Sequence, residues 1–80
     1  MTDGQGIRVR PGSTVRIRQA SGIEEEWTIV PPFQASTLRS RLSEMSPLGF
    51  ALIGHMVGDQ VTVRERDGRR SVTIIDVTTP

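Results

Sequence analysis

The stretch from Ser46 to Gly54 constrains the fold of this chain more than any other part of its sequence. Ser46 can cap a helix, because its hydroxyl can accept a hydrogen bond from a free N–H of the first turn. Pro47 suits the first helical position, where its missing N–H costs nothing. Gly54 can adopt the left-handed conformation that ends many helices. The pattern therefore predicts one short helix over about residues 47–53.

The residues inside this predicted helix are almost all apolar. Leu48, Ala51 and Leu52 share one face at the i, i+3, i+4 spacing, and Phe50 and Ile53 lie on a neighbouring arc. We expect a helix this apolar to be largely buried, in the curve of a sheet.

The rest of the chain alternates between short β-rich runs and turn residues. Residues 14–19 and 24–30 indicate a hairpin, because apolar and polar positions alternate along the first run and the second is rich in β-forming residues. Residues 61–66 and 72–77 indicate a second hairpin around the Asp-Gly pair at 67–68, which is typical of a type I′ turn. The sequence therefore predicts an α+β domain with four to five short antiparallel strands around one short helix.

Prolines and glycines mark the connections between these runs. The Pro-Gly pair at 11–12 predicts a turn that is type II if the glycine takes a positive φ. The Pro-Pro pair at 31–32 ends the second strand, because neither residue can donate to a ladder. Residues 33–41 fit either a helical turn or a loop, and residues 42–45 could form a short strand.

The length of 80 residues suffices for one domain, which we place at residues 8–78 behind a disordered lead-in at residues 1–7. The chain has no cysteine, so it offers no disulfide or thiolate metal site, which fits a reducing cytoplasm. No apolar run approaches the roughly 20 residues that a membrane span needs, and residues 1–18 contain no apolar signal-peptide region. We expect a cytoplasmic protein without membrane contact.

The sequence offers no constellation for catalysis or metal binding. His55 is the single histidine, and without a cysteine or a second histidine it has no metal-ligating partners at a useful spacing. We interpret it as an exposed polar residue that follows the helix. The serines lie in no nucleophile elbow, and no glycine-rich phosphate loop occurs. The chain is therefore predicted not to be an enzyme and to hold no metal or cofactor.

Several short motifs, taken together, resemble one known family. The run from Ser46 to Gly54 is followed by VGDQV at residues 57–61. This SP…AL.G…VGD spacing resembles the signature of the C-terminal domain of the bacterial GreA/GreB transcript cleavage and elongation factors. Four other segments also resemble that domain: residues 9–15, 27–30, 42–43 and 67–77. The resemblance covers residues 8–77, which is nearly the whole chain.

The resemblance implies an FKBP-like fold, in which a strongly curved antiparallel sheet half-wraps one helix. It also implies docking on RNA polymerase at the rim of the secondary channel, against the coiled coil of the largest subunit. In the family, the loop that enters the short helix is a main contact. Carried over to this chain, the partner-binding residues are Glu44, Met45, Ser46, Pro47 and Leu48. We expect the domain to act as a monomer.

The sequence departs from the family pattern in three places. Full Gre factors carry an N-terminal coiled coil whose acidic tip helps to hold a catalytic magnesium ion, and residues 1–7 are too few for a coiled coil. We therefore expect a free-standing C-terminal domain that regulates transcription without stimulating transcript cleavage. The family's acidic loop after the second strand reads PPFQAS at residues 31–36, and the residue before Ser-Pro, often Asn or Asp in the family, is Met45.

The charged residues add two further hypotheses. All ten basic residues are arginine, and nine acidic residues offset them to a net charge of +1, so charge alone does not favour nucleic acid as the main partner. The acidic run at 24–26 protects a sheet edge or forms an acidic patch. Four arginines would form one basic stripe on the outer sheet face, serving either solubility or contact with an acidic polymerase helix or a nucleic-acid backbone: Arg16, Arg18, Arg64 and Arg66.

Two other functions are compatible with the sequence. A Gre-type domain could bind a different target, as some regulators of nucleotide metabolism do. An FKBP-like fold also suggests a peptidyl-prolyl isomerase, but those enzymes bind proline in a pocket rich in aromatic side chains. This chain has three aromatic residues and no tyrosine, and we expect Trp27 to lie in the core, so such a pocket is hard to build.

Overall fold

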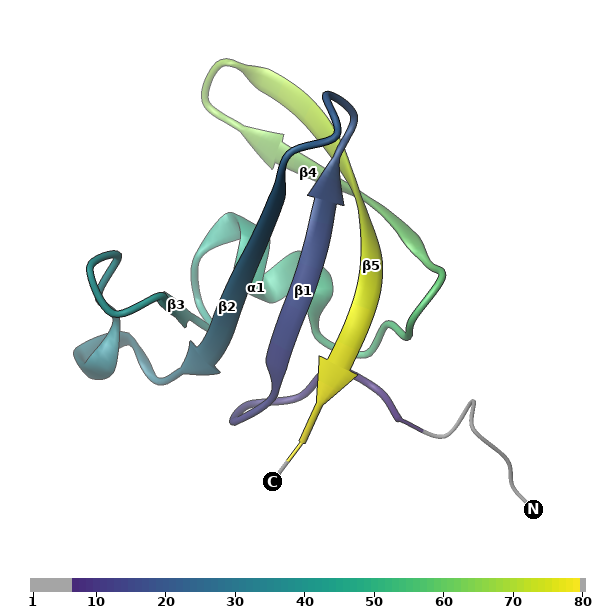
Figure 1. The fold of residues 1–80 in the computed structure, drawn as a ribbon. Helices are drawn as coiled ribbons and strands as arrows, with labels where there is room; N and C mark the ends of the chain where they lie inside the picture. The colour runs from purple at the N-terminus through teal and green to yellow at the C-terminus, as the bar shows by residue number, and fades with distance from the viewer. Residues whose placement is uncertain (1–6, 80) are drawn as a thin grey trace.

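The protein, described here over residues 7–79 of a computed structural model, folds as one curved sheet around one α-helix (Figure 1). The sheet has five strands in the order β3-β2-β1-β5-β4. The elements are β1 (Thr14–Gln19), β2 (Glu24–Val30), the 3₁₀ helix η2 (Pro32–Gln34), β3 (Arg41–Ser43), α1 (Pro47–Leu52), β4 (Gln60–Glu65) and β5 (Gly68–Thr78). This confirms the predicted α+β class, with a curved sheet and one short helix.

The first hairpin forms as its alternation predicted. Strands β1 and β2 pair antiparallel from Thr14, opposite Thr28, to Arg18, opposite Glu24. The turn before β1 is also confirmed, because the Ser13 N–H donates to the Arg10 carbonyl at 2.8 Å. Gly12 at the third position of that turn has a φ of +97°, the positive value that a type II turn requires.

Strand β3 corrects the expectation of a purely antiparallel sheet. It pairs parallel with β2, with Thr28 opposite Arg41 and Val30 opposite Ser43. The physical reason is the connection between them, since Pro31 and Pro32 end β2 and the chain then passes through η2 and a turn before β3. Parallel neighbours need such a crossover, whereas a tight turn would have returned the chain antiparallel. The sheet is therefore mixed.

The second hairpin forms where it was predicted, but its turn differs. Glu65 pairs with Gly68, so the two loop residues are Arg66 and Asp67 rather than Asp67 and Gly68. Within this turn only Gly68 has a positive φ, at +131°. A type I′ turn needs positive φ at both central residues, so the predicted turn type is wrong. The glycine instead begins strand β5.

A bulge in β5 interrupts its pairing with β1. Arg16 of β1 pairs with Asp76, but the next residue, Ile17, pairs with Ile74, which leaves Ile75 as an extra residue. Such bulges bend a strand and increase its twist. The sheet curves around α1, which contacts both β3 and β4, the strands at the two opposite edges of the sheet (Figure 1).

Helix α1 is buried on one face only, which corrects the expectation for Phe50. Leu48 and Leu52 are at most 5% exposed, whereas Phe50 is 73% exposed. Residues two apart on a helix do not share a face, so a helix seated on Leu48 and Leu52 turns Phe50 outward. The core around α1 is formed by Val9, from the segment before β1, and mainly by strand residues: Val15, Ile17, Ile29, Val61, Val63, Val72, Ile74 and Val77.

Trp27 lies at the margin of this core rather than inside it. Its ring packs against the core cluster and is half-buried. Its indole N–H donates to the Glu25 carboxylate at 3.0 Å. A tryptophan at such a margin keeps its polar N–H satisfied while its ring covers apolar neighbours.

The predicted lead-in lies, apart from Ile7, outside the described residues, and the domain bounds of 8–78 stay a prediction. Within residues 7–79, no helix is long and apolar enough to cross a membrane.

Candidate functional site

The loop that connects β3 to α1 presents apolar side chains to solvent. Met45 is 70% exposed and Pro47 is also exposed, while Phe50 projects from the first turns of the helix. Glu44 is half-buried, and its N–H donates to the Val30 carbonyl at 2.8 Å. The structure thus brings most of the predicted partner-binding residues to one surface.

Leu48 is the exception among those predicted residues. It is 5% exposed and belongs to the hydrophobic core. Leu48 therefore packs the helix against the core and is not accessible to a partner. Phe50, which the sequence analysis did not assign to the site, points outward instead.

Ser46 fixes the shape of this loop through both of its hydrogen-bonding roles. Its hydroxyl donates to the Ser43 carbonyl at 2.7 Å and accepts from the Gly49 N–H at 3.1 Å. The Met45 N–H donates to the Ser43 hydroxyl at 3.0 Å. The predicted N-cap is therefore confirmed, and the same hydroxyl also ties the helix start to the end of β3.

Gly49 allows the helix to approach β3 closely. A Cβ at this position would collide with the Ser43 carbonyl oxygen, which belongs to the backbone and cannot move aside easily. The glycine is therefore required by close packing rather than by an unusual φ. Together with the Ser46 hydrogen bonds, this contact holds Met45 and Pro47 in one arrangement.

Two further exposed apolar side chains come from elements next to this loop. Phe33 in η2 is 84% exposed, and Leu38 in the turn before β3 is 97% exposed. Both η2 and α1 pack against β3. We name Phe33, Leu38, Met45, Pro47 and Phe50 the apolar end of the molecule. Sequence reasoning missed Phe33 and Leu38 because they lie in a segment without periodicity, where a large apolar residue gives no indication of its burial.

The four arginines predicted as one basic stripe do not form one. Arg16 and Arg18 are exposed on β1, as expected, but glutamates of β2 face them in register. Arg18 contacts Glu24 at 3.0 Å, and Arg16 lies 3.8 Å from both Glu24 and Glu26. The acidic run is therefore a partner of these arginines within the same sheet face.

The other two arginines of the predicted stripe lie elsewhere. Arg64 and Arg66 are exposed on the β4–β5 hairpin, and strand β5 separates β4 from β1. The sequence placed Arg16, Arg18 and Arg64 on the correct face, whereas Arg66 lies in the turn beyond the end of β4. Only the strand order showed that they form two groups with different surroundings.

The connection from α1 to β4 is held by a polar cluster around Asp59. Its carboxylate accepts from the Met56 N–H at 3.0 Å and lies 3.1 Å from His55 Nδ1. The Met56 N–H, followed by the His55 side chain, lowers the pKa of Asp59 below its usual range. His55 is half-buried in this cluster, which corrects the expectation of a simply exposed residue. Within the described part of the chain, no three metal-ligating side chains gather at one place.

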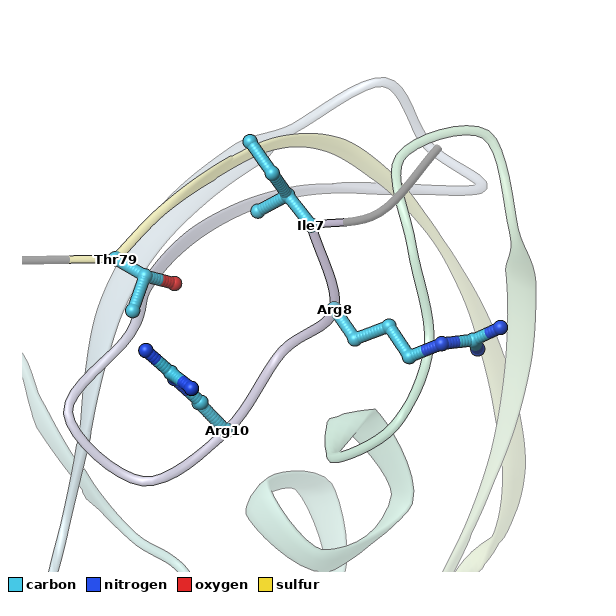
Figure 2. A pocket seen from close by; sticks show the side chains of 4 residues that line it. All are labelled: Ile7, Arg8, Arg10 and Thr79. Atoms are coloured by element: carbon cyan, nitrogen blue, oxygen red, sulfur yellow. The ribbon is translucent and has the colours of Figure 1, made fainter. Parts of the chain in front are cut away.

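A shallow pocket lies where the N-terminal and C-terminal segments meet (Figure 2). It is lined by Ile7, Arg8, Arg10 and Thr79, without an aromatic side chain. Figure 2 shows Arg8 directed away from Arg10, and the Arg8 guanidinium donates to the Gly54 carbonyl at 2.8 Å. The two guanidinium groups therefore do not converge on a common ligand position.

The molecule is a small α+β domain in which a curved sheet covers one helix. Its candidate site is the exposed apolar loop before that helix, which Ser46 holds in place, and not the pocket of Figure 2. Residues 5–79 match the family described as "Transcription elongation factor, GreA/GreB, C-term". The chain belongs to this family.

Individual relatives agree with this assignment. The chain is 43% identical over 70 residues to the transcription elongation factor GreA of Chloroflexus aurantiacus, covering 86% of this chain and 45% of the relative. It is 41% identical over 76 residues to GreA of Thermomicrobium roseum, covering 95% and 48% respectively. The chain thus spans about half the length of the curated relatives that it matches.

Solved structures show the same fold. The crystal structure of GreA factor homolog 1 of Thermus thermophilus superposes with a TM-score of 0.80 at 30% identity, covering 98% of this chain and 53% of that one. A GreA/GreB elongation factor from Nitrosomonas europaea gives a TM-score of 0.71 at 35% identity, covering 88% and 59%. The predicted family resemblance is therefore confirmed.

Proposed function

We propose that this domain is a transcription regulator that docks on RNA polymerase at the rim of the secondary channel, against the coiled coil of the largest subunit. The observation that carries the proposal is the exposed Met45-Ser46-Pro47 loop, pinned by Ser46 between Ser43 and Gly49. Membership of the transcription elongation factor family supports the choice of partner. A cytoplasmic location follows from the proposal, because bacterial polymerase works there.

The physical case for docking rests on burial and on rigidity. Covering an exposed side chain such as Met45 or Phe50 contributes about 1.5–3 kcal/mol. A loop already held in its bound shape loses little conformational entropy on binding, so more of that contribution appears as affinity. We propose a single copy of the domain as the docking unit, with Glu44 at the margin of the contact.

We further propose that residues 1–80 acting alone do not stimulate transcript cleavage. The longest helix among residues 7–79 is α1, with six residues, and no group of three potential metal ligands occurs in that range. The family resemblance attributes cleavage to acidic residues on a coiled coil that reaches the polymerase active site. The described domain offers a docking surface without such an arm.

The test is direct binding of the 80-residue polypeptide to core RNA polymerase, with competition by a full-length GreA. The informative variants are Pro47→Ala and the double variant Met45→Ser/Phe50→Ser. Ile23→Ser is the matched control, because Ile23 is also an exposed apolar residue, at 60%, but lies at the β1–β2 turn. We expect binding that both site variants weaken, that the control preserves and that GreA displaces.

Two other outcomes would redirect the proposal. Loss of binding only with Arg64→Glu/Arg66→Glu would move the contact to the β4–β5 hairpin. No binding by the wild-type domain at tens of micromolar, about the weak end for transient interfaces, would contradict polymerase docking and favour a Gre-type domain with another target. The isomerase alternative receives no support from the pocket in Figure 2, which has no aromatic lining.

A further inference from the structure

The tip of the β4–β5 hairpin concentrates guanidinium groups in a way that the rest of the sheet does not. Arg64 lies directly opposite Arg69 in the strand register, and Arg66 occupies the loop between them. All three side chains are exposed. We name Arg64, Arg66 and Arg69 the arginine tip.

The carboxylates on the same hairpin form no ion pair with the arginine tip. Glu65 forms an ion pair with Arg70, whose Nε lies 3.1 Å from the Glu65 carboxylate. Within residues 7–79, no carboxylate lies within ion-pairing distance of the three arginines of the tip. Asp67 in the loop is the one other acidic residue of the hairpin turn.

The arginine tip faces outward because the inward positions are occupied by the core. Val61 and Val63 are buried, so the alternate residues Thr62 and Arg64 point to the outer face of the sheet. On β5, Ser71 is the cross-strand partner of Thr62, and their hydroxyl oxygens lie 3.5 Å apart. On the outer face of the hairpin, the hydroxyl pair Thr62 and Ser71 is thus followed by the guanidinium pair Arg64 and Arg69.

This arrangement is unfavourable for the isolated domain, because like charges directly opposite each other on neighbouring strands repel. The same sheet shows the favourable alternative, since Arg16 and Arg18 on β1 face Glu26 and Glu24 on β2. The contrast is informative, because an acidic residue opposite Arg64 would have removed the repulsion. A partner that supplies negative charge would stabilise the arginine tip in the same way.

The surroundings of the tip indicate the class of that partner. None of the large apolar side chains exposed among residues 7–79 lies on strands β4 or β5. A protein partner usually contacts an apolar, often aromatic, centre, whereas a nucleic-acid backbone is bound by polar, strongly positive surfaces with guanidinium and hydroxyl donors. Single strands are gripped mainly by stacking on aromatic rings, and the hairpin has none.

We propose that the arginine tip binds the phosphate backbone of duplex DNA. A two-stranded β-ribbon is one of the shapes that the major groove admits, so the hairpin can approach a duplex with its outer face toward the phosphates. In Figure 1 the hairpin loop projects at the top of the molecule, away from β3, the strand against which η2 and α1 of the apolar end pack. This inference is independent of polymerase docking, which uses the apolar end.

Binding of this kind has a measurable electrostatic signature. Neutralising about three phosphates gives a slope of about −2.7 in log K against log salt concentration. The affinity for a duplex should then fall about 40-fold between 50 and 200 mM salt. The contacts reach only the backbone, so the affinity should not depend on base sequence.

The experiment titrates the 80-residue chain into a labelled duplex of about 20 base pairs, two helical turns, and follows fluorescence anisotropy. The protein concentration runs to about 1 mM, beyond the weak end of non-specific affinities. The test variant is Arg64→Gln/Arg66→Gln/Arg69→Gln. The matched control is Arg16→Gln/Arg18→Gln, which removes arginines of the same sheet face that already have glutamate partners. Circular dichroism verifies that each variant is folded.

The proposal is supported if the triple variant loses at least tenfold in affinity, the control retains it, and the amide shifts of wild-type residues 62–71 move on adding duplex. It is overturned if wild-type protein does not bind at 50 mM salt, or if both variants weaken binding equally. It is also overturned if a single-stranded RNA of the same length or polyglutamate binds the tip more tightly than the duplex does. Polymerase binding is measured separately, so either proposal can fail without the other.

Discussion

The apolar end and the arginine tip lie at the two opposite edges of one small sheet, next to β3 and β4, yet they differ in what holds them and in what they expose to water. At the apolar end, Ser46 and Gly49 fix a loop that exposes Met45 and Phe50 to water. At the arginine tip, the ladder of β4 and β5 holds Arg64 and Arg69 side by side. The first surface has a hydrophobic cost in the free domain and the second an electrostatic one, which suggests two partners of different chemistry.

The largest change in stability is expected from a substitution beneath the apolar end, at Gly49. Gly49→Ala places a methyl group against the Ser43 carbonyl oxygen, so α1 must shift away from β3. We expect a loss of about 1–3 kcal/mol in the free energy of unfolding, measured by urea denaturation. Polymerase affinity should fall as well, because the loop changes shape.

The same Gly49→Ala variant also tests whether the apolar end and the arginine tip are structurally independent. Amide shifts in an NMR spectrum should change around residues 43–50 and stay in place around residues 64–69. Shifts of equal size at the arginine tip would mean that the two surfaces are mechanically coupled, contrary to this expectation.

The N-cap provides the next largest effect. Ser46→Ala removes the acceptor for the Gly49 N–H, and we expect a loss of about 1 kcal/mol in the free energy of unfolding. Ser46→Gly is the control, since glycine is tolerated at N-caps at a cost of only a few tenths of a kcal/mol. If both variants lose equally in thermal denaturation, the Ser46 hydrogen bond to the Ser43 carbonyl matters more than the cap itself.

Two arginine substitutions should change stability with opposite signs. Arg69→Gln relieves the repulsion from Arg64 and should stabilise the free domain by about 0.2–1 kcal/mol. Arg18→Gln removes an exposed ion pair with Glu24 and should destabilise it by at most about 1 kcal/mol. Unfolding midpoints at low salt measure both effects, and the difference should shrink as salt screens the charges. Equal signs would contradict the contrast between the two groups of arginines.

The smallest effect concerns pH and the loop between α1 and β4. Because the folded-state pKa of Asp59 is lowered, mainly by the Met56 N–H, its ionised form stabilises the folded protein. That contribution is present above the unfolded pKa of about 3.9 and is lost as pH falls through the folded pKa. In Asp59→Asn it is absent at every pH, so the stability difference between the two proteins should shrink on acidification. A difference that stays constant between about pH 6 and pH 2 would show that Asp59 acts without its charge.

The local elements of the fold were predictable because their causes lie within a few residues. The type II turn at Gly12, the β1–β2 hairpin and the cap at Ser46 each depend on the conformational preferences or short-range hydrogen bonds of neighbouring residues. The proposed docking loop was located by its similarity to a family motif, and Met45 and Pro47 are exposed in the structure. Whether they bind polymerase stays a prediction.

Most errors in the sequence-based expectations arose where distant segments meet, and the turn of the second hairpin is the local exception. The direction of β3 depends on where the chain re-enters the sheet after η2, which no pattern in residues 31–40 specifies. The burial of Leu48 and the exposure of Phe50 depend on which face of α1 the sheet covers. For an almost uniformly apolar helix, the sequence offers two candidate faces and no local reason to choose between them.

The sequence by itself determined most of the elements and the alternation of buried and exposed residues along β1 and β4, because backbone sterics and strand alternation act locally. It left residues 33–41 undecided and placed the turn of the second hairpin one residue too late. Tertiary structure alone decided which strands are neighbours, since pairing joins residues far apart in the chain. That decision placed glutamates opposite Arg16 and Arg18 but set Arg69 opposite Arg64. The electrostatic character of each surface follows from this strand order, because the interaction between two charges depends on their distance in space and not on their separation in sequence.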